Sequence, residues 1–289
     1  FGLFTISASN AALTVRNSVS GEGGVIESTN ATVYPFVITR QRASNSRLVI
    51  EKGVTVKGPV FINDFENATL DVYGTIDTTG WDSGEAAIYN NGSNTNNSTI
   101  NLYDGSVIKS NTLGVYHPGP GTLNVYGGAE ITAGDVGIEM RAGTLNVYDG
   151  AVITSTGTGE PSSAPNGSGA TSHNAAVAIA QHDTKLPVVF NAYGGTFTGS
   201  AAVYESNPQG NDADAIEKIT LNIENGMFEG KVESATQEGF ISGGTFTVEP
   251  ATEDIYPGLQ AVEDGGNFTI ARLQDVYVSG CLLYTSPSP

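Results

Sequence analysis

One unit of sequence occurs twice in close succession, and it constrains the fold more than any other feature of the chain. Residues 121–133 read GTLNVYGGAEITA and residues 143–155 read GTLNVYDGAVITS, so that Leu123 and Leu145 lie 22 positions apart (145 − 123). Near-identical units at this spacing are typical of repeat architectures, in which one unit buries its apolar face only by stacking on its neighbours. The sequence therefore predicts a stack of similar turns.

Looser copies of the unit run through most of the chain. Each copy has an apolar residue at the position of Leu123, and most of these residues are about 22 positions apart. Where the spacing is larger, polar inserts near residues 80–97 and 156–172 account for the excess; both are rich in the Gly, Asn, Ser or Pro residues typical of loops. The equivalent residues are Leu48, Leu70, Ile100, Leu123, Leu145, Phe190 and Leu221.

Alternation within the unit gives its geometry. In the segment TLNVY, Leu and Val share one face of a strand, whereas Thr, Asn and Tyr share the other. A glycine turn then leads to a second short run, and a third run precedes the next copy at residues 86–89, 114–116, 136–139, 176–180 and 201–204. We expect three short strands per turn, with a second inward stack formed by Ile76, Ile108, Ile131, Ile153 and Phe197.

This pattern resembles the right-handed parallel β-helix, an all-β coil whose successive turns pair along its axis. The resemblance implies a β-solenoid of about 22 residues per turn over residues 1–250. A leucine-rich repeat fits less well because its L-x-x-L-x-L-x-x-N frame is absent. A left-handed hexapeptide helix requires a six-residue period, and a β-sandwich does not explain near-identical units.

Residues 241–270, ISGGTFTVEPATEDIYPGLQAVEDGGNFTI, carry a second resemblance. They are similar to the closing segment of repeat modules in large secreted or cell-surface proteins of Gram-positive commensal bacteria, although residues 256–259 read YPGL where that family more often has Gly-Tyr. Runs 259–262 and 267–270 flank Asp264-Gly265-Gly266, which predicts a hairpin. Segment 251–280 is therefore expected to be a terminal hairpin that caps the coil, or the start of a next module. The resemblance implies an extracellular, modular, cell-associated protein.

Residues 281–289, CLLYTSPSP, resemble the translation of a sequencing-library adapter. That resemblance implies a non-native tail and a non-native Cys281, the only cysteine, so we expect no disulfide framework. Because the chain begins at Phe1 with strand-like sequence close behind, we also expect a fragment of a longer protein.

The net charge of the chain limits the classes of partner that it is expected to bind. Twelve basic residues against thirty acidic ones give a net charge of −18. Nucleic-acid binding is not expected, because it requires clusters of Lys and Arg. No apolar run approaches the roughly 20 residues of a membrane span.

The outward face of the TLNVY strand is the candidate carbohydrate-binding surface. If the turns are in register, tyrosine rings stack as a ladder beside a row of amides, and rings with amides suit sugar recognition. The interpretation favoured over glycan binding is that like residues simply stack and stabilise the turns. The candidate residues are Tyr73, Tyr103, Tyr126, Tyr148, Tyr193, Asn101, Asn124 and Asn146.

Catalysis has weaker support. Polysaccharide lyases and hydrolases also use this fold, but no Gly-His-Gly segment is present, and fold alone does not establish activity. Asp135, Glu139 and Arg141 are expected to be surface charges on a solvated face. The histidines match no zinc motif, so we assign no catalytic residue, metal site or cofactor.

We therefore expect a non-catalytic extracellular stalk or adhesin segment, a monomeric rod whose partner is a polysaccharide or host-surface glycan. The alternative is a polysaccharide-degrading β-helix enzyme or a fragment of one. Trp81, in a polar insert, is expected to anchor that insert to the rod, with an exposed sugar platform as its alternative role.

Overall fold

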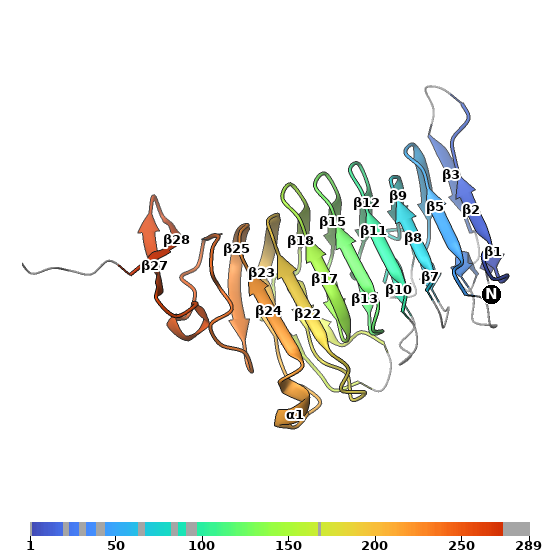
Figure 1. Cartoon of the computed structure of the whole chain (residues 1–289). Coiled ribbons are helices and arrows are strands. Elements are labelled where there is room, and N and C mark those ends of the chain that lie inside the picture. The colour runs from blue at the N-terminus through green and yellow to red at the C-terminus, as the bar shows by residue number, and fades with distance from the viewer. Residues whose placement is uncertain are drawn as a thin grey trace, which may run out of the picture.

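Strands with the TLNVY pattern stack directly on one another in the computed structural model of the chain (Figure 1). The structure describes residues 2–19, 23–28, 33–38, 44–62, 67–81, 86–90, 97–166 and 169–273. Within these residues, the first strand of each turn belongs to an eight-stranded parallel sheet. Its strands are β2 (Ala12–Val15), β5 (Arg47–Ile50), β8 (Thr69–Val72), β11 (Thr99–Leu102), β14 (Thr122–Val125), β17 (Gly143–Val147), β22 (Val188–Ala192) and β24 (Ile219–Ile223).

The second strands of the turns form another parallel row. Each pairs with its equivalent in the next turn, for example Ile131 with Ile153. The row consists of β3 (Gly24–Glu27), β6 (Val54–Lys57), β9 (Thr75–Asp77), β12 (Val107–Ser110), β15 (Glu130–Ala133), β18 (Val152–Ser155), the first parts of β23 (Thr196–Glu205) and β25 (Met227–Ser234), and β26 (Thr245–Phe246).

The third strands form a row of their own, which merges with the second row where β23 and β25 run through the corner as continuous strands. Together with the C-terminal hairpin described below, the two rows make an 18-stranded sheet, and the pairing of β23 with β25 is irregular near Ala201. The third row consists of β1 (Gly2–Ile6), β4 (Tyr34–Ile38), β7 (Val60–Ile62), β10 (Ile88–Asn90), β13 (Leu113–His117), β16 (Val136–Met140), β21 (Ala175–Ile179) and the second parts of β23 and β25.

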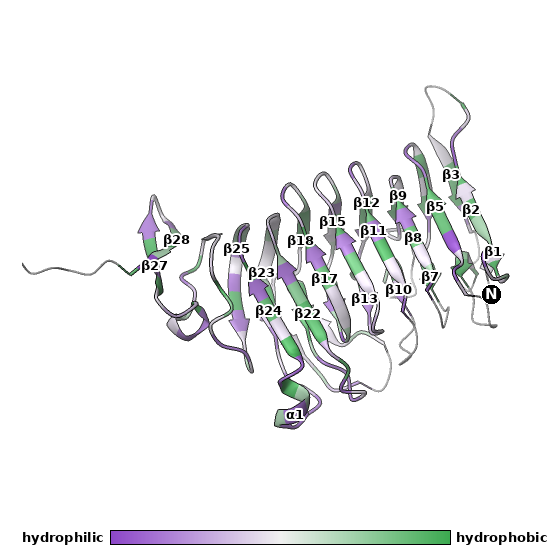
Figure 2. Cartoon of the chain, viewed as in Figure 1, coloured by the Kyte–Doolittle hydropathy of each residue, from purple (hydrophilic) through white to green (hydrophobic). Residues whose placement is uncertain are grey.

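The inward stacks match the sequence prediction residue by residue. Leu123 pairs with Leu145, and Leu145 pairs with Phe190, so the insert 156–172 leaves the coil without disturbing its register. All predicted members of both stacks are buried. Figure 2 shows the resulting alternation of hydrophobic and hydrophilic positions along the strands. The chain is thus an all-β parallel β-helix, as its repeat predicts.

Glycine is required where successive turns approach closely at a corner. A Cβ built on Gly121 would lie 1.9 Å from the carbonyl oxygen of Ser98, and one on Gly134 would lie 1.9 Å from that of Asn111. Contacts this short exclude any side chain without a backbone shift. Glycine at these corners therefore allows each turn to keep the same shape, although glycine has no side chain that packs.

The C-terminal part departs from the regular coil. Three phenylalanine rings, Phe197, Phe228 and Phe246, stack inside the last turns with centroids 4.8 and 4.9 Å apart. The expected hairpin is present as β27 (Leu259–Asp264) and β28 (Asn267–Arg272), and β28 pairs antiparallel with β26. Gly265 and Gly266 have φ angles of 61° and 88°, which suit a two-residue turn between twisted strands.

Short elements complete the description. The helix α1 (Ala213–Ile216) follows β23, the 3₁₀ helix η1 (Thr252–Asp254) precedes the hairpin, and β19 (Ser162–Ser163) pairs antiparallel with β20 (Ser172–His173). Among the described residues, none of the helices has the length and apolar character needed to cross a membrane. The tail 281–289 and much of the insert 80–97 lie outside the described residues.

Candidate functional site

A continuous chain of side-chain amides runs along the outer face of the eight-stranded sheet. Asn124 donates from Nδ2 to Oδ1 of Asn101 at 2.8 Å, and Asn146 donates to Asn124 at 2.9 Å. Asn191 and Asn222 extend the chain in the same direction, each through a bond of 2.8 Å. Because every amide donates to the preceding turn, these bonds polarise one another and link the turns along the axis.

The amide chain ends on a carboxylate. Asn101 donates to Oδ1 of Asp71 at 2.8 Å, and Arg47 binds Oδ2 through Nε at 2.7 Å and Nη2 at 2.6 Å. Asp71 is buried, whereas the Arg47 side chain is about half exposed. The hydrogen bond to Asp71, followed by its charge, raises the pKa of Arg47. A buried carboxylate with these partners is the terminal acceptor of the amide chain and not a free acid or base.

The tyrosines that follow the amides stack face to face. Ring centroids are 4.5 Å apart for Tyr73 and Tyr103, 5.0 Å for Tyr103 and Tyr126, 5.0 Å for Tyr126 and Tyr148, and 5.5 Å for Tyr148 and Tyr193. The first three pairs are tilted by only 8°, 5° and 7°. The predicted residues are therefore brought together in one ordered row.

This stacking decides what the rings offer to a ligand. Sugar recognition by an aromatic residue uses the face of the ring, and both faces of Tyr103, Tyr126 and Tyr148 are covered by neighbouring rings. Tyr193, at the end of the row, is 40% exposed and stacks on one ring among the described residues. Desolvation, followed by the charge of Asp71, raises the pKa of Tyr103 to about 12.

A polar hollow lies at the opposite end of the same strands. Its volume is about 420 Å³. It borders the residues two positions before the amides, whereas the tyrosines lie two positions after them, so about 13 Å of strand separates the hollow from the rings. The hollow therefore offers hydroxyls and amides without an aromatic surface. Its lining residues are Asn45, Arg47, Asn67, Thr69, Asn97, Ser98, Thr99 and Thr122.

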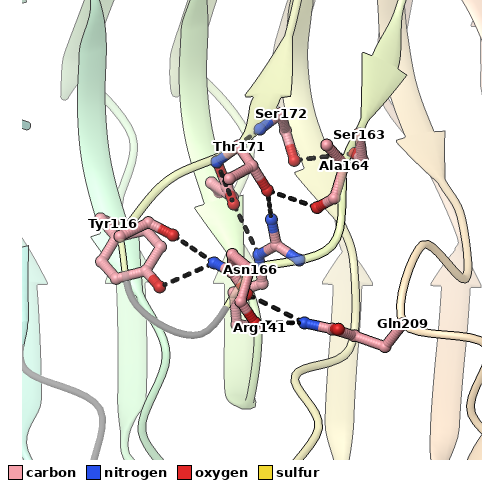
Figure 3. Close-up of polar contacts among 10 residues, drawn as sticks. Tyr116, Arg141, Ser163, Ala164, Asn166, Thr171, Ser172 and Gln209 are labelled. Atoms are coloured by element: carbon pink, nitrogen blue, oxygen red, sulfur yellow. Dashed lines mark hydrogen bonds and ion pairs between the residues drawn. The ribbon is translucent and has the colours of Figure 1, made fainter.

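The expectation that Glu139 and Arg141 are solvated surface charges is wrong. Both side chains are 0% exposed, and Nε of Arg141 lies 2.6 Å from Oε1 of Glu139. The described part of the insert 156–172 folds back over this pair. Thr171 accepts a hydrogen bond from Nη2 of Arg141 (Figure 3). The backbone amides of Thr171 and Ser172 donate to Glu139. The backbone of the insert thereby satisfies a carboxylate on the outer face of β16.

The described part of the insert also covers an apolar patch on the outer face of the third strand row. Asn166 donates to the hydroxyl of Tyr116, and Gln209 donates to Asn166 from a later turn (Figure 3). Burial, followed by the charge of Glu139, raises the pKa of Tyr116. One feature of the sequence indicated this cover: strands of the third row have apolar residues on their outward face as well as on their inward face. The patch comprises Ala86, Leu113, Tyr116, Val136, Ala175, Ala178 and Ala201.

Asp135 differs from Glu139 and Arg141 because its side chain remains 33% exposed. Its Oδ2 lies 2.7 Å from Nδ1 of His173, and its Oδ1 accepts from the amide of Asn174 at 2.7 Å. These contacts hold the end of the insert at the edge of the coil. Among the described residues, no group of three or more His, Cys, Asp or Glu side chains is placed to hold a metal ion.

Comparison with known proteins adds no relative: no family model matches the chain, and no curated protein or solved structure matches it.

Proposed function

We propose that the chain is a non-catalytic, rod-like stalk or adhesin segment of an extracellular bacterial surface protein. The observation that carries this proposal is the amide chain from Asp71 to Asn222, in which the outward polar groups of one turn bond to those of the next. Surface side chains committed to their neighbours stiffen a stack of turns. A stalk requires that property.

The stacked rings support the same role. In the middle of the row, the tyrosine faces that would bind a sugar are covered by other tyrosines. Stacking of sugar on this surface therefore falls to the end rings, Tyr73 and Tyr193, of which Tyr193 is exposed and Tyr73 is partly buried. The favoured function of the ladder is to join turns, with glycan contact limited to its ends.

The buried ion pair supports a non-catalytic role at the one place where acid and base are adjacent in sequence. Glu139 and Arg141 are covered by the insert and 0% exposed, so neither touches a polymer running along the rod. Extracellular location is supported by the resemblance of residues 241–270 to surface-protein repeat modules.

Two measurements on the purified chain test this proposal. Small-angle scattering is expected to show an elongated monomer of 29.9 kDa, and incubation with pectin-like polymers is expected to release neither reducing nor unsaturated sugar. A compact particle, or the release of either sugar product, would overturn it. Surface labelling of intact cells that carry the native gene tests the location, and labelling only after cell lysis would contradict it.

A further inference from the structure

A row of alternating charges runs along the outer face of the second strand row. Glu27 pairs in register with Lys57, Lys57 with Asp77, and Asp77 with Lys109. Nζ of Lys57 lies 3.7 Å from Oε2 of Glu27, and both side chains are about half exposed. The ammonium group and the carboxylates thus face solvent together.

Trp81 lies at the corner that follows this row. Its amide donates to the carbonyl of Thr78 at 2.9 Å, which turns the chain back toward the rod. A Cβ built on Gly58 would lie 3.0 Å from Cζ3 of the indole, so the ring packs against this glycine. The indole Nε1 is buried and has no partner among the described residues, so packing holds the ring. The ring thus meets the expectation of an anchor.

The same indole also lines a cleft. The cleft has a volume of about 250 Å³, at or below the smaller end of small-molecule sites. That size suits one sugar ring rather than a long oligosaccharide. The cleft is lined by Glu27, Ser28, Lys57, Gly58, Asp77, Thr79, Gly80 and Trp81.

The polar groups of the cleft are arranged around Asp77. Thr79 donates both its amide, at 2.9 Å, and its hydroxyl, at 2.6 Å, to Oδ1 of Asp77. Oδ2 has no hydrogen-bond partner among the described residues. The side chain is therefore fixed through one oxygen, and the other oxygen is available as an acceptor. Carboxylate acceptors form strong hydrogen bonds with hydroxyl donors.

We infer that this cleft binds a single pyranose ring that carries no acidic group, either a free sugar or the end of a glycan. An indole beside a fixed carboxylate and an ammonium combines apolar surface with the acceptors and donors that sugar hydroxyls require. Two carboxylates against one ammonium make the lining negative, which disfavours a uronic acid. The site is independent of the rod proposal, since a stalk that binds no sugar at this corner remains a stalk.

Trp81 is the only tryptophan in the chain, so its fluorescence reports directly on this cleft. We would titrate the full chain with methyl glucoside, methyl galactoside and methyl mannoside, and with glucuronate and glucosamine as charged probes. At least one neutral glycoside is expected to give a saturable change, with a dissociation constant on the order of 1 mM. Glucuronate is expected to bind at least about tenfold more weakly than that glycoside.

Variants assign the response to the cleft. Asp77→Asn is expected to weaken the response at least about tenfold with an unchanged melting temperature, because one acceptor oxygen becomes a donor. If Asp77→Asn does not fold, Lys57→Gln tests the same lining and is expected to weaken binding. Lys109→Gln, the next residue of the charge row but outside the cleft, is expected to leave the titration unchanged.

The inference is overturned if no neutral glycoside gives a saturable change, if a folded Asp77→Asn protein binds as tightly as the parent, or if glucuronate binds best. Tyr126→Ala separates this site from the ladder. A titration unchanged in that variant supports the cleft, whereas a lost response in a folded Tyr126→Ala protein places the binding on the tyrosines and overturns it.

Discussion

Asn124 donates from Nδ2 to Oδ1 of Asn101 at 2.8 Å, although the two residues lie 23 positions apart in sequence. Their backbones pair in register in neighbouring strands, β14 and β11. Asn146 donates to Asn124 in turn. A partly buried amide thus acts as donor to one turn and acceptor from the next, which makes it a structural link along the outer face.

Asn124→Asp tests this link with little change in size. The carboxylate has no proton to donate to Asn101, so two acceptor oxygens face each other. The free energy of unfolding in urea is expected to fall by about 1–3 kcal/mol. The loss is expected to shrink below pH of about 4, where the new carboxyl becomes protonated and regains a donor.

Asn225→Asp provides the matched control, because Asn225 is exposed and its side chain makes no hydrogen bond within the described structure. Its effect is expected to stay within about 0.5 kcal/mol. Equal effects of the two substitutions would show that charge alone, and not the amide chain, sets the stability.

Local periodicity predicted the coil and both inward stacks. Leu48 to Leu221 and Ile76 to Phe197 needed only alternation and spacing, because each residue packs against its equivalent in the next turn. The ladder of Tyr73 to Tyr193 followed for the same reason. The prediction of glycan binding by these residues remains a prediction.

The burial of Glu139 and Arg141 could not be predicted in this way. It depends on contacts with Thr171 and Ser172, about 30 residues away in an insert without a repeat. Periodicity states which face of a strand points outward, but it does not state what later covers that face. The cleft at Trp81 likewise combines a corner residue with two different turns.

Arg141→Met tests the covered ion pair. The substitution leaves Glu139 buried without its cation, so unfolding free energy is expected to fall by about 3–5 kcal/mol. The double variant Glu139→Gln/Arg141→Met is expected to recover part of the loss, because no uncompensated charge remains. Urea unfolding measures stability, and limited proteolysis reports whether the insert has lifted from the coil.

Arg16→Met is the control for that experiment, because the Arg16 side chain is 68% exposed and lies 4.0 Å from Glu51. Its effect is expected to stay within about 0.5 kcal/mol. If Arg141→Met is as mild as Arg16→Met, the pair does not hold the insert in place.

The raised pKa of Asp254 predicts that the folded chain gains stability on mild acidification. Desolvation, followed by the charges of Glu253, Glu238 and Glu233, raises its pKa from 3.8 to about 7. A raised folded-state pKa favours the protonated carboxyl, so this group's contribution is present below pH 3.8 and is lost as the pH rises to about 7. Asp254→Asn is expected to stabilise the chain by more than about 1 kcal/mol above pH 7.

The difference between Asp254→Asn and the parent is expected to vanish near pH 3.8, measured as unfolding free energy across the titration. A difference that does not depend on pH would mean that Asp254 has the same pKa in the folded and the unfolded chain, and it would contradict the raised value.

The lowered pKa of His117 predicts the opposite dependence of stability on pH. Burial lowers its pKa from 6.5 to about 4, although Nδ1 donates to the carbonyl of Ala142 at 3.1 Å. The unfolded chain takes up a proton first, so stability is lost as the pH falls from 6.5 to about 4. In His117→Gln this part of the acid loss is expected to disappear, as measured by melting temperature; an unchanged pH profile would contradict the assignment.

The central claim is that the tyrosine row joins turns rather than binding glycan. The variants Tyr126→Ala and Tyr148→Ala test this claim most directly when stability and polysaccharide binding are measured on the same proteins. Each variant removes a ring stacked on both faces, so we predict a loss of about 1–3 kcal/mol of unfolding free energy. Tyr193→Ala, which removes one ring contact, is expected to lose less. Binding of a polysaccharide panel is predicted to be unchanged in the two middle variants. Unchanged stability together with lost binding would contradict the account.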